Sequence, residues 1–158
     1  MDSTPVIFTV KLASIIPSLM LAGYTVARYG YISRLYDERP QISTSLFKTS
    51  FRHSGKWAVP MCQFMLLASA YLAYFIPEKR KLWIVAADMA IGELVWTRFA
   101  MFPGIQRIIA ISEDEKVQKK CEQTLEHRQL MTTWAKQNFV RTAFAVVGGM
   151  AGLWASMA

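Results

Sequence analysis

Two short stretches carry side chains capable of chemistry at the margins of long apolar segments. In WAKQNFVR, Trp134, Asn138 and Arg141 fall within ~60° of one another on a helix that turns about 100° per residue. In GELVWT, Glu93 and Thr97 lie one helical turn apart. An indole ring can stack on a flat molecule, an amide and a guanidinium can hold its oxygens, and a desolvated carboxylate can accept a proton. These residues therefore predict a pocket for a partly apolar, oxygen-bearing aromatic molecule.

Two further polar residues, Arg98 and Gln63, lie at a similar distance from the ends of their apolar segments and are candidate substrate-binding residues. His53, just before the second segment, is a further candidate substrate-binding residue. An alternative stays open for the arginines, because Arg98 and Arg141 can each extend along the helix and place the guanidinium among lipid headgroups. The shorter side chain of Asn138 cannot reach that far, which favours a pocket.

The two histidines, His53 and His127, precede the second and fourth apolar segments. Neither belongs to a metal-ligand spacing such as His-x-x-x-His, and no cysteine cluster accompanies them. The sequence also lacks a phosphate-binding loop, a dinucleotide fingerprint and a Gly-x-Ser-x-Gly elbow. We therefore expect simple acid-base chemistry, or a cofactor that no motif announces. A haem or metal held by the histidines is the alternative.

Four apolar segments must position these side chains, at residues 6–27, 57–76, 82–102 and 138–157. Each has the roughly 20 residues needed to cross about 30 Å of hydrocarbon as a helix. Helices satisfy their own backbone hydrogen bonds in lipid, so the sequence predicts an all-α fold. The expected architecture is a single integral membrane domain over residues 1–158, an antiparallel bundle of four transmembrane helices. A soluble four-helix bundle is the alternative.

The distribution of basic residues predicts the topology of this bundle. The net charge is +7, which in a soluble protein would suggest nucleic acid, but here the basic residues gather in the two long connections. The short connection between the second and third segments has only Lys79, Arg80 and Lys81. The positive-inside rule therefore places the long connections in the cytosol and both termini on the other side, with the endoplasmic reticulum as the expected membrane.

The connection between the third and fourth segments contains its own helix signal. FPG at 102–104 is expected to end the third helix. Ser112 opens SEDE, a Ser-x-x-Glu capping box, which predicts a cytosolic helix over about 113–136 that leads into the fourth span. Gly148 and Gly152 form a Gly-x-x-x-Gly pair in that span, which suits close packing within the bundle or a homodimer contact.

Lys11 and Asp88 lie at matching depths, roughly 7 to 9 Å from the non-cytosolic ends of the first and third segments. We expect them to form an ion pair, because isolated charges are costly in a bilayer. Lys11 shares a helical face with Ser14, Ser18 and Thr25, and this polar stripe is expected to face the interior of the bundle.

Three stretches resemble the anthrone oxygenase-like family of small four-helix membrane proteins from fungal aromatic polyketide pathways. RQLMTTWAKQNFVRTAFAVVGGMAGLWA is similar to the closing segment of that family, with Trp134, Asn138 and Arg141 in its Trp, Asn, Arg pattern. FRHSGKWAVPMCQFMLLASAYLAY resembles its Gly-Lys followed by Pro, at residues 55, 56 and 60. WTRFAMFP resembles the end of its third helix, with Thr97 and Met101.

The resemblance implies oxidation of an anthrone methylene to the anthraquinone carbonyl with molecular oxygen as co-substrate. Such chemistry need not require a metal, because the electron-rich enolate can itself pass an electron to oxygen, so no other cofactor is expected. Such a reaction needs a base, a clamp for the enolate oxygen and an apolar slot. We assign the clamp to Arg141 and Asn138 and the stacking wall to Trp134, with Glu93 or His127 as the base. The expected partners are a hydrophobic aromatic substrate and the lipid bilayer, without nucleic acid.

Two other functions stay open at this point. The chain can be a non-catalytic membrane partner that anchors biosynthetic enzymes through the helix ending near Lys136. It can also be a haem- or quinone-binding membrane protein with His53 and His127 as ligands.

Overall fold

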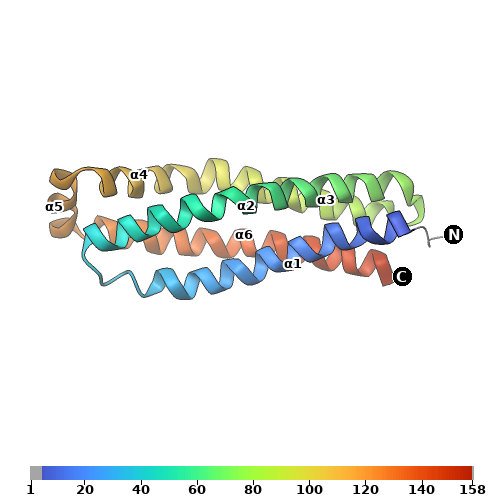
Figure 1. The fold of residues 1–158 in the computed structure, drawn as a ribbon, viewed down its shortest axis with the longest axis horizontal. Coiled ribbons are helices and arrows are strands. Elements are labelled where there is room, and N and C mark those ends of the chain that lie inside the picture. Colours follow the sequence, from blue (N-terminus) through green and yellow to red (C-terminus); the bar gives the residue numbers. More distant parts are fainter. Residues whose placement is uncertain (1–4, 158) are drawn as a thin grey trace.

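The computed structural model describes residues 5–157, and within that range the chain is helical with no strand, which confirms the predicted all-α class. The helices form one elongated bundle (Figure 1). In chain order the elements are α1 (Pro5–Ser33), α2 (Pro40–Phe75), the 3₁₀ turn η1 (Pro77–Lys79), α3 (Arg80–Trp96), the π-helical turn η2 (Thr97–Met101), α4 (Phe102–Glu113), α5 (Glu115–Thr124) and α6 (Glu126–Met157).

Three long helices and one composite helix make up the bundle. α1 contacts α2 and α6, and α3 contacts the same two helices. α4 continues the line of α3, so the pair runs the length of the bundle beside α2 and α6 (Figure 1). The short α5 closes one end, and the chain termini and η1 lie at the other (Figure 1).

Three helices, α1, α2 and α6, are long and apolar enough to cross a membrane. The predicted third span over 82–102 is not a single α-helix, because α3 ends at Trp96 and a π-helical turn follows it. α2 begins at Pro40, well before the predicted span at 57–76. Its 36 residues extend for about 54 Å at ~1.5 Å per residue. A hydrocarbon layer is about 30 Å thick. The bundle is therefore longer than a bilayer is thick.

The prediction that FPG ends the third helix is wrong. α4 begins at Phe102 and carries Pro103 in its first turn, directly after the wider π-helical turn η2. The π-helical turn η2 joins the two α-helices without a break in direction (Figure 1).

The prediction of one cytosolic helix over 113–136 that starts from Ser112 is also wrong. The N-cap of α5 is Asp114, whose carboxylate accepts hydrogen bonds from the amides of Lys116 and Val117 at 2.8 and 3.4 Å. A carboxylate two residues further along the chain thus replaces the serine as cap. Leu125 adopts a left-handed conformation, φ 53°, which separates α5 from α6.

A polar seam of small side chains joins α1 to its neighbours through the middle of the bundle. Ser14 Oγ and Ser69 Oγ are 2.7 Å apart, and Ser18 Oγ donates to the carbonyl of Ala145 at 2.6 Å. Thr25 is also buried, so the predicted inward face of α1 is confirmed. Lys11 is half-buried and Asp88 is exposed, and the structure records no ion pair between these two described residues, so that expectation is wrong.

The exposed apolar side chains lie mainly in the half of the bundle that contains the termini. The exposed apolar residues include Ile84, Ile91 and Val95 on α3, and Phe64 and Leu67 on α2. Between residues 102 and 137 Leu125 is the one large hydrophobic residue that is exposed. The surface of the bundle therefore changes from apolar to polar along its length, as expected for a bundle that stands partly in lipid.

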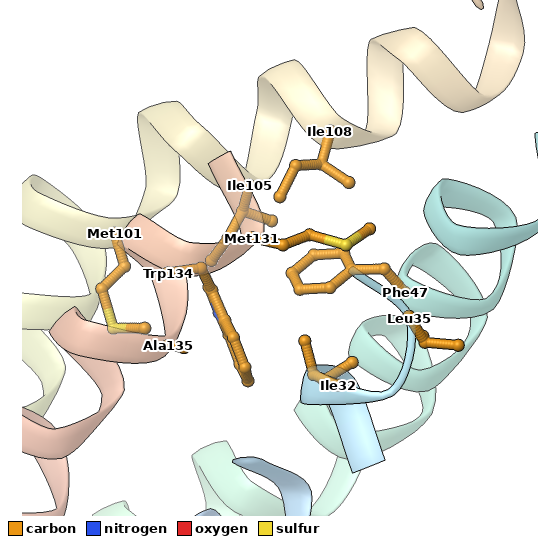
Figure 2. Close-up of a cluster of buried hydrophobic side chains, with 9 residues drawn as sticks. All are labelled: Ile32, Leu35, Phe47, Met101, Ile105, Ile108, Met131, Trp134 and Ala135. Atoms are coloured by element: carbon orange, nitrogen blue, oxygen red, sulfur yellow. The ribbon is translucent and has the colours of Figure 1, made fainter. Parts of the chain in front are cut away.

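The half near α5 has an aromatic and aliphatic core of its own (Figure 2). Trp134 and Phe47 meet edge to face at its centre, with ring centroids 5.2 Å apart and planes at 90°. Ile105 and Met131 fill the space around them. This core holds α4 and the first turns of α6 in place beyond the apolar surface.

Candidate active site

A buried ion pair connects α3 to α6. Arg141 Nε lies 3.3 Å from Glu93 Oε1, and the two side chains are 11% and 3% exposed. The other carboxylate oxygen, Glu93 Oε2, is buried without a hydrogen-bond partner among the described residues. A buried carboxylate with one free oxygen is an acceptor held ready for a ligand proton or a ligand hydroxyl.

Beside this ion pair is a cavity of about 480 Å³. Its volume falls in the range of ~300 to 1,000 Å³ that is usual for small-molecule sites. It lies between α2, α3, η2, α4 and α6, and most of its lining is apolar. The lining residues are Phe51, Gly55, Ala58, Val59, Cys62, Glu93, Leu94, Thr97, Arg98, Phe102 and Arg141.

The π-helical turn η2 forms one wall of this cavity. Thr97 Oγ1 donates to the carbonyl of Glu93 at 2.7 Å, and the Arg98 guanidinium lies 4.7 Å from the centre of the Phe102 ring. Gln137 Nε2 donates to the Ala100 carbonyl at 3.0 Å and so satisfies a backbone acceptor in the turn. π-helical turns inside α-helices occur often at functional sites, because the wider turn changes the direction of the side chains that follow.

Asn138 and Trp134 are buried on α6 but do not line the cavity. Asn138 Nδ2 donates to the carbonyl of Thr25 at 3.3 Å, which turns the amide toward α1, and its Oδ1 has no partner in the described chain. Trp134 belongs to the core shown in Figure 2. It is two helical turns, about 10 Å, from Arg141 along the axis. Of the three residues predicted to share one face, Arg141 alone reaches the cavity.

The remaining predicted residues lie elsewhere. His127 is buried beside Cys121, whose sulfur accepts a hydrogen bond from the His127 amide at 3.2 Å. Burial raises the pKa of the Cys121 thiol, so this contact is a neutral one that fixes the junction of α5 and α6. His53 and Gln63 are exposed on α2 and do not line the cavity.

The two histidines are too far apart to share a ligand. His127 and Pro40 line the same surface depression near α5. His53 lies a further 13 positions along α2, about 20 Å away at ~1.5 Å per residue. Among residues 5–157 no group of three or more His, Cys, Asp or Glu side chains is arranged to hold a metal ion.

Two residues in this part of the bundle were not singled out in the sequence. Cys62 lines the cavity from α2 beside the Glu93 carboxylate. Arg28 is buried on α1 behind Phe51 and lies just beyond the first apolar segment, residues 6–27. A signal for Arg28 was present, because it continues the polar stripe of Ser14, Ser18 and Thr25 at helical spacing.

The comparisons with known proteins agree with the resemblance drawn from the short motifs. The model of the anthrone oxygenase family matches residues 47–151, which include every residue that lines the cavity. No curated protein and no solved structure shows significant similarity to the chain. Family membership suggests an oxygenase-like role, and the three long apolar helices suggest association with a membrane. With about two thirds of its length matched, the chain belongs to the anthrone oxygenase family.

Proposed function

We propose that this chain is a membrane-embedded oxygenase that oxidises the methylene of an anthrone-type aromatic polyketide to a carbonyl with molecular oxygen. The observation that carries the proposal is the ion pair of Glu93 and Arg141 on the wall of a mostly apolar cavity. A flat, oily substrate fits such a cavity, and the one buried carboxylate on its wall has an oxygen without a partner.

The first step is removal of a methylene proton by the Glu93 carboxylate. The electron pair of that C–H bond moves into the ring system and gives an enolate, whose oxygen Arg141 stabilises by charge. The enolate transfers one electron to molecular oxygen, and the resulting radical and superoxide combine to form a C–O bond.

The second half of the reaction returns the site to its starting state. Glu93 protonates the peroxide and then removes the remaining hydrogen from the same carbon. The electron pair of that C–H bond forms the carbonyl while the O–O bond breaks and releases hydroxide, which the carboxylic acid protonates to water. In sum, one anthrone and one oxygen molecule give one anthraquinone and one water.

The geometry favours Glu93 over His127 as the base. His127 precedes Arg141 by 14 positions on α6, which is about 21 Å along the helix. A general base must lie within hydrogen-bond reach of the proton that it removes, directly or through one water. Thr97 and Arg98 line the cavity, so we place them in the substrate wall. Asn138 and Trp134 do not line it, and we give them a role in packing α6 against α1 and α2.

The site fits a position just inside the cytosolic face of a bilayer. We propose that α3 with η2 is a fourth crossing, since α3 exposes an apolar surface like that of its neighbours. Glu93 is then about 20 Å from the start of α3, and Arg141 about 24 Å from the end of α6. In a layer of about 30 Å both lie 6 to 10 Å below the basic side. The positive-inside rule places that side in the cytosol, and the endoplasmic reticulum is the membrane we propose.

Oxygen uptake by the purified protein tests the proposal. The assay measures oxygen consumption with anthrone in detergent, after subtraction of the autoxidation that occurs with empty micelles. Glu93→Gln is expected to lower the catalysed rate by ~10² to 10⁴, the usual contribution of a general base. The matched control is Asp88→Asn, which changes an exposed carboxylate on the same helix and is expected to retain the wild-type rate.

Uptake that equals autoxidation in the wild-type protein would refute the oxygenase function and leave the membrane anchor as the surviving alternative. Unchanged uptake in Glu93→Gln would refute the assignment of the base. An absorption spectrum of the same preparation tests the haem alternative, because a bound haem would give a strong band in the visible region.

A further inference from the structure

Arg28 is a buried cation that no carboxylate accompanies. The residue is 6% exposed on α1, and its Nη1 donates to Ser54 Oγ at 2.7 Å. Its Nε and Nη2 are buried without a hydrogen-bond partner in the described chain. The ion pairs recorded among residues 5–157 do not include it. A buried charge of this kind is costly unless something compensates it.

Aromatic rings surround the guanidinium and compensate the charge only in part. Its carbon lies 5.1 Å from the centre of the Trp134 ring and 5.9 Å from the centres of the Phe47 and Phe51 rings. Such contacts attract a cation to the ring face. They do not replace the hydrogen bonds that the two free N–H groups would make.

Phe51 connects Arg28 to the cavity. Its half-buried ring lines the cavity and also faces the guanidinium. Arg28 itself does not line the cavity, so a substituent on a flat guest reaches the guanidinium only past the edge of the Phe51 ring. The charged groups on the cavity wall are the guanidinium groups of Arg98 and Arg141 and the carboxylate of Glu93. Arg28 behind Phe51 adds a third guanidinium, so the site has a surplus positive charge before any guest binds.

We propose that Arg28 binds an ionised oxygen on the substrate, at a ring position remote from the reacting methylene, so that the site selects anionic aromatic molecules over neutral ones. The ionised group is a carboxylate or a phenolate, because both present an oxygen with a negative charge to the free N–H groups. This inference rests on the proposed function for the identity of the guest. Arg28 lies outside the segment that matches the family, residues 47–151.

A binding experiment tests the inference without turnover. Two matched pairs of probes are titrated into the protein in a neutral detergent, and quenching of tryptophan fluorescence reports binding. The first pair is anthraquinone-2-carboxylate and its methyl ester, and the second is 2-hydroxyanthraquinone above its ionisation pH and 2-methoxyanthraquinone. The proteins are the wild type, Arg28→Met, Arg28→Gln, Arg28→Lys and the control Arg34→Met, which removes an exposed arginine near the end of the same helix.

The wild type is expected to bind at least one anion ~10 to 100 times more tightly than its neutral partner, as a charge-assisted hydrogen bond implies. Arg28→Met and Arg28→Gln are expected to lose that preference, Arg28→Lys to keep part of it, and Arg34→Met to keep all of it. The pair that shows the preference identifies the ionised group.

Equal binding within both pairs in the wild type would overturn the inference, whether or not the neutral variants fold. A preference that persists in Arg28→Met or Arg28→Gln would overturn it as well, and would make Arg28 a structural residue held by the surrounding rings. Anion preference that depends on Arg28, in a protein that consumes no oxygen, would refute the proposed function alone. Catalysed oxygen uptake without any anion preference would refute this inference alone.

Discussion

Removal of Arg141 is expected to destabilise the protein more than removal of Arg141 and Glu93 together. In Arg141→Met the Glu93 carboxylate stays buried without its partner. The two atoms of the ion pair are 3.3 Å apart, which corresponds to about 5 kcal/mol of attraction at an effective dielectric constant of ~20. Breaking a buried pair by loss of one partner costs ~3 to 5 kcal/mol in measured cases, because an uncompensated charge remains. We expect a loss in that range for the single variant.

The double variant Glu93→Gln/Arg141→Met removes both charges and keeps side chains of similar volume. It is expected to recover most of the stability, with a coupling free energy of ~2 to 3 kcal/mol between the two positions. Neither variant is expected to catalyse oxygen uptake, because one lacks the clamp and the other lacks the base as well. Stability and activity therefore separate in the double variant.

The assay is equilibrium unfolding in mixed micelles with increasing dodecyl sulfate, followed by helical circular dichroism. The free energies of the wild type, both single variants and the double variant close a thermodynamic cycle. The two single variants in this cycle are Arg141→Met and Glu93→Gln. Equal stability of Arg141→Met and the wild type, or a coupling near zero, would refute the charge pairing on which the catalytic assignment rests.

Three further outcomes are expected. A methyl group at Gly148 would lie 3.1 Å from a side-chain carbon of α3, whereas Gly23 has open space, so Gly148→Val should cost ~1 to 3 kcal/mol in the same unfolding assay and Gly23→Val should not. The Lys48 ammonium, 2.7 Å from Glu113, lowers the pKa of that carboxyl through a hydrogen bond. The stabilisation by this ion pair is therefore complete above the unfolded pKa of ~4.3 and is lost as the pH falls through the folded pKa. Glu113→Gln should remove the dependence of the melting temperature on pH over that window. Deletion of the exposed Phe99 should convert η2 into a regular α-helical turn. Circular dichroism should then show that the helices stay packed, while anthrone oxidation is lost. Retained oxidation would exclude a role for the π-helical turn.

Helical periodicity and apolar length predicted the elements of this fold well where the signal is local. The apolar segments at 6–27 and 138–157 lie within α1 and α6, and the short turn before Arg80 separates α2 from α3 as expected. Gly148 and Gly152 pack against α3 and α1 inside the chain, while a homodimer through them stays a prediction.

The elements that were mispredicted depend on competition between neighbouring signals. Ser112 and Asp114 are both good N-caps, and the choice between them depends on how α4 ends against the bundle. The continuation through Phe102 depends on η2, whose carbonyl at Ala100 is satisfied by the side chain of Gln137, 37 positions away. No local pattern contains such a partner.

The sequence by itself determined that the chain is helical and that its apolar segments can stand in lipid. It also determined that Glu93, Thr97, Arg98 and Arg141 lie in the halves of their segments nearest the basic connections, because rise per residue and hydropathy are properties of single helices. Only the tertiary structure decided that these four share a cavity, that Asn138 and Trp134 turn toward α1 and α2, and that Arg28 is buried without a counter-charge. The physical reason is that the rotation of each helix about its axis depends on the side chains of its neighbours, so a face that one helix presents acquires its partners only in the packed bundle.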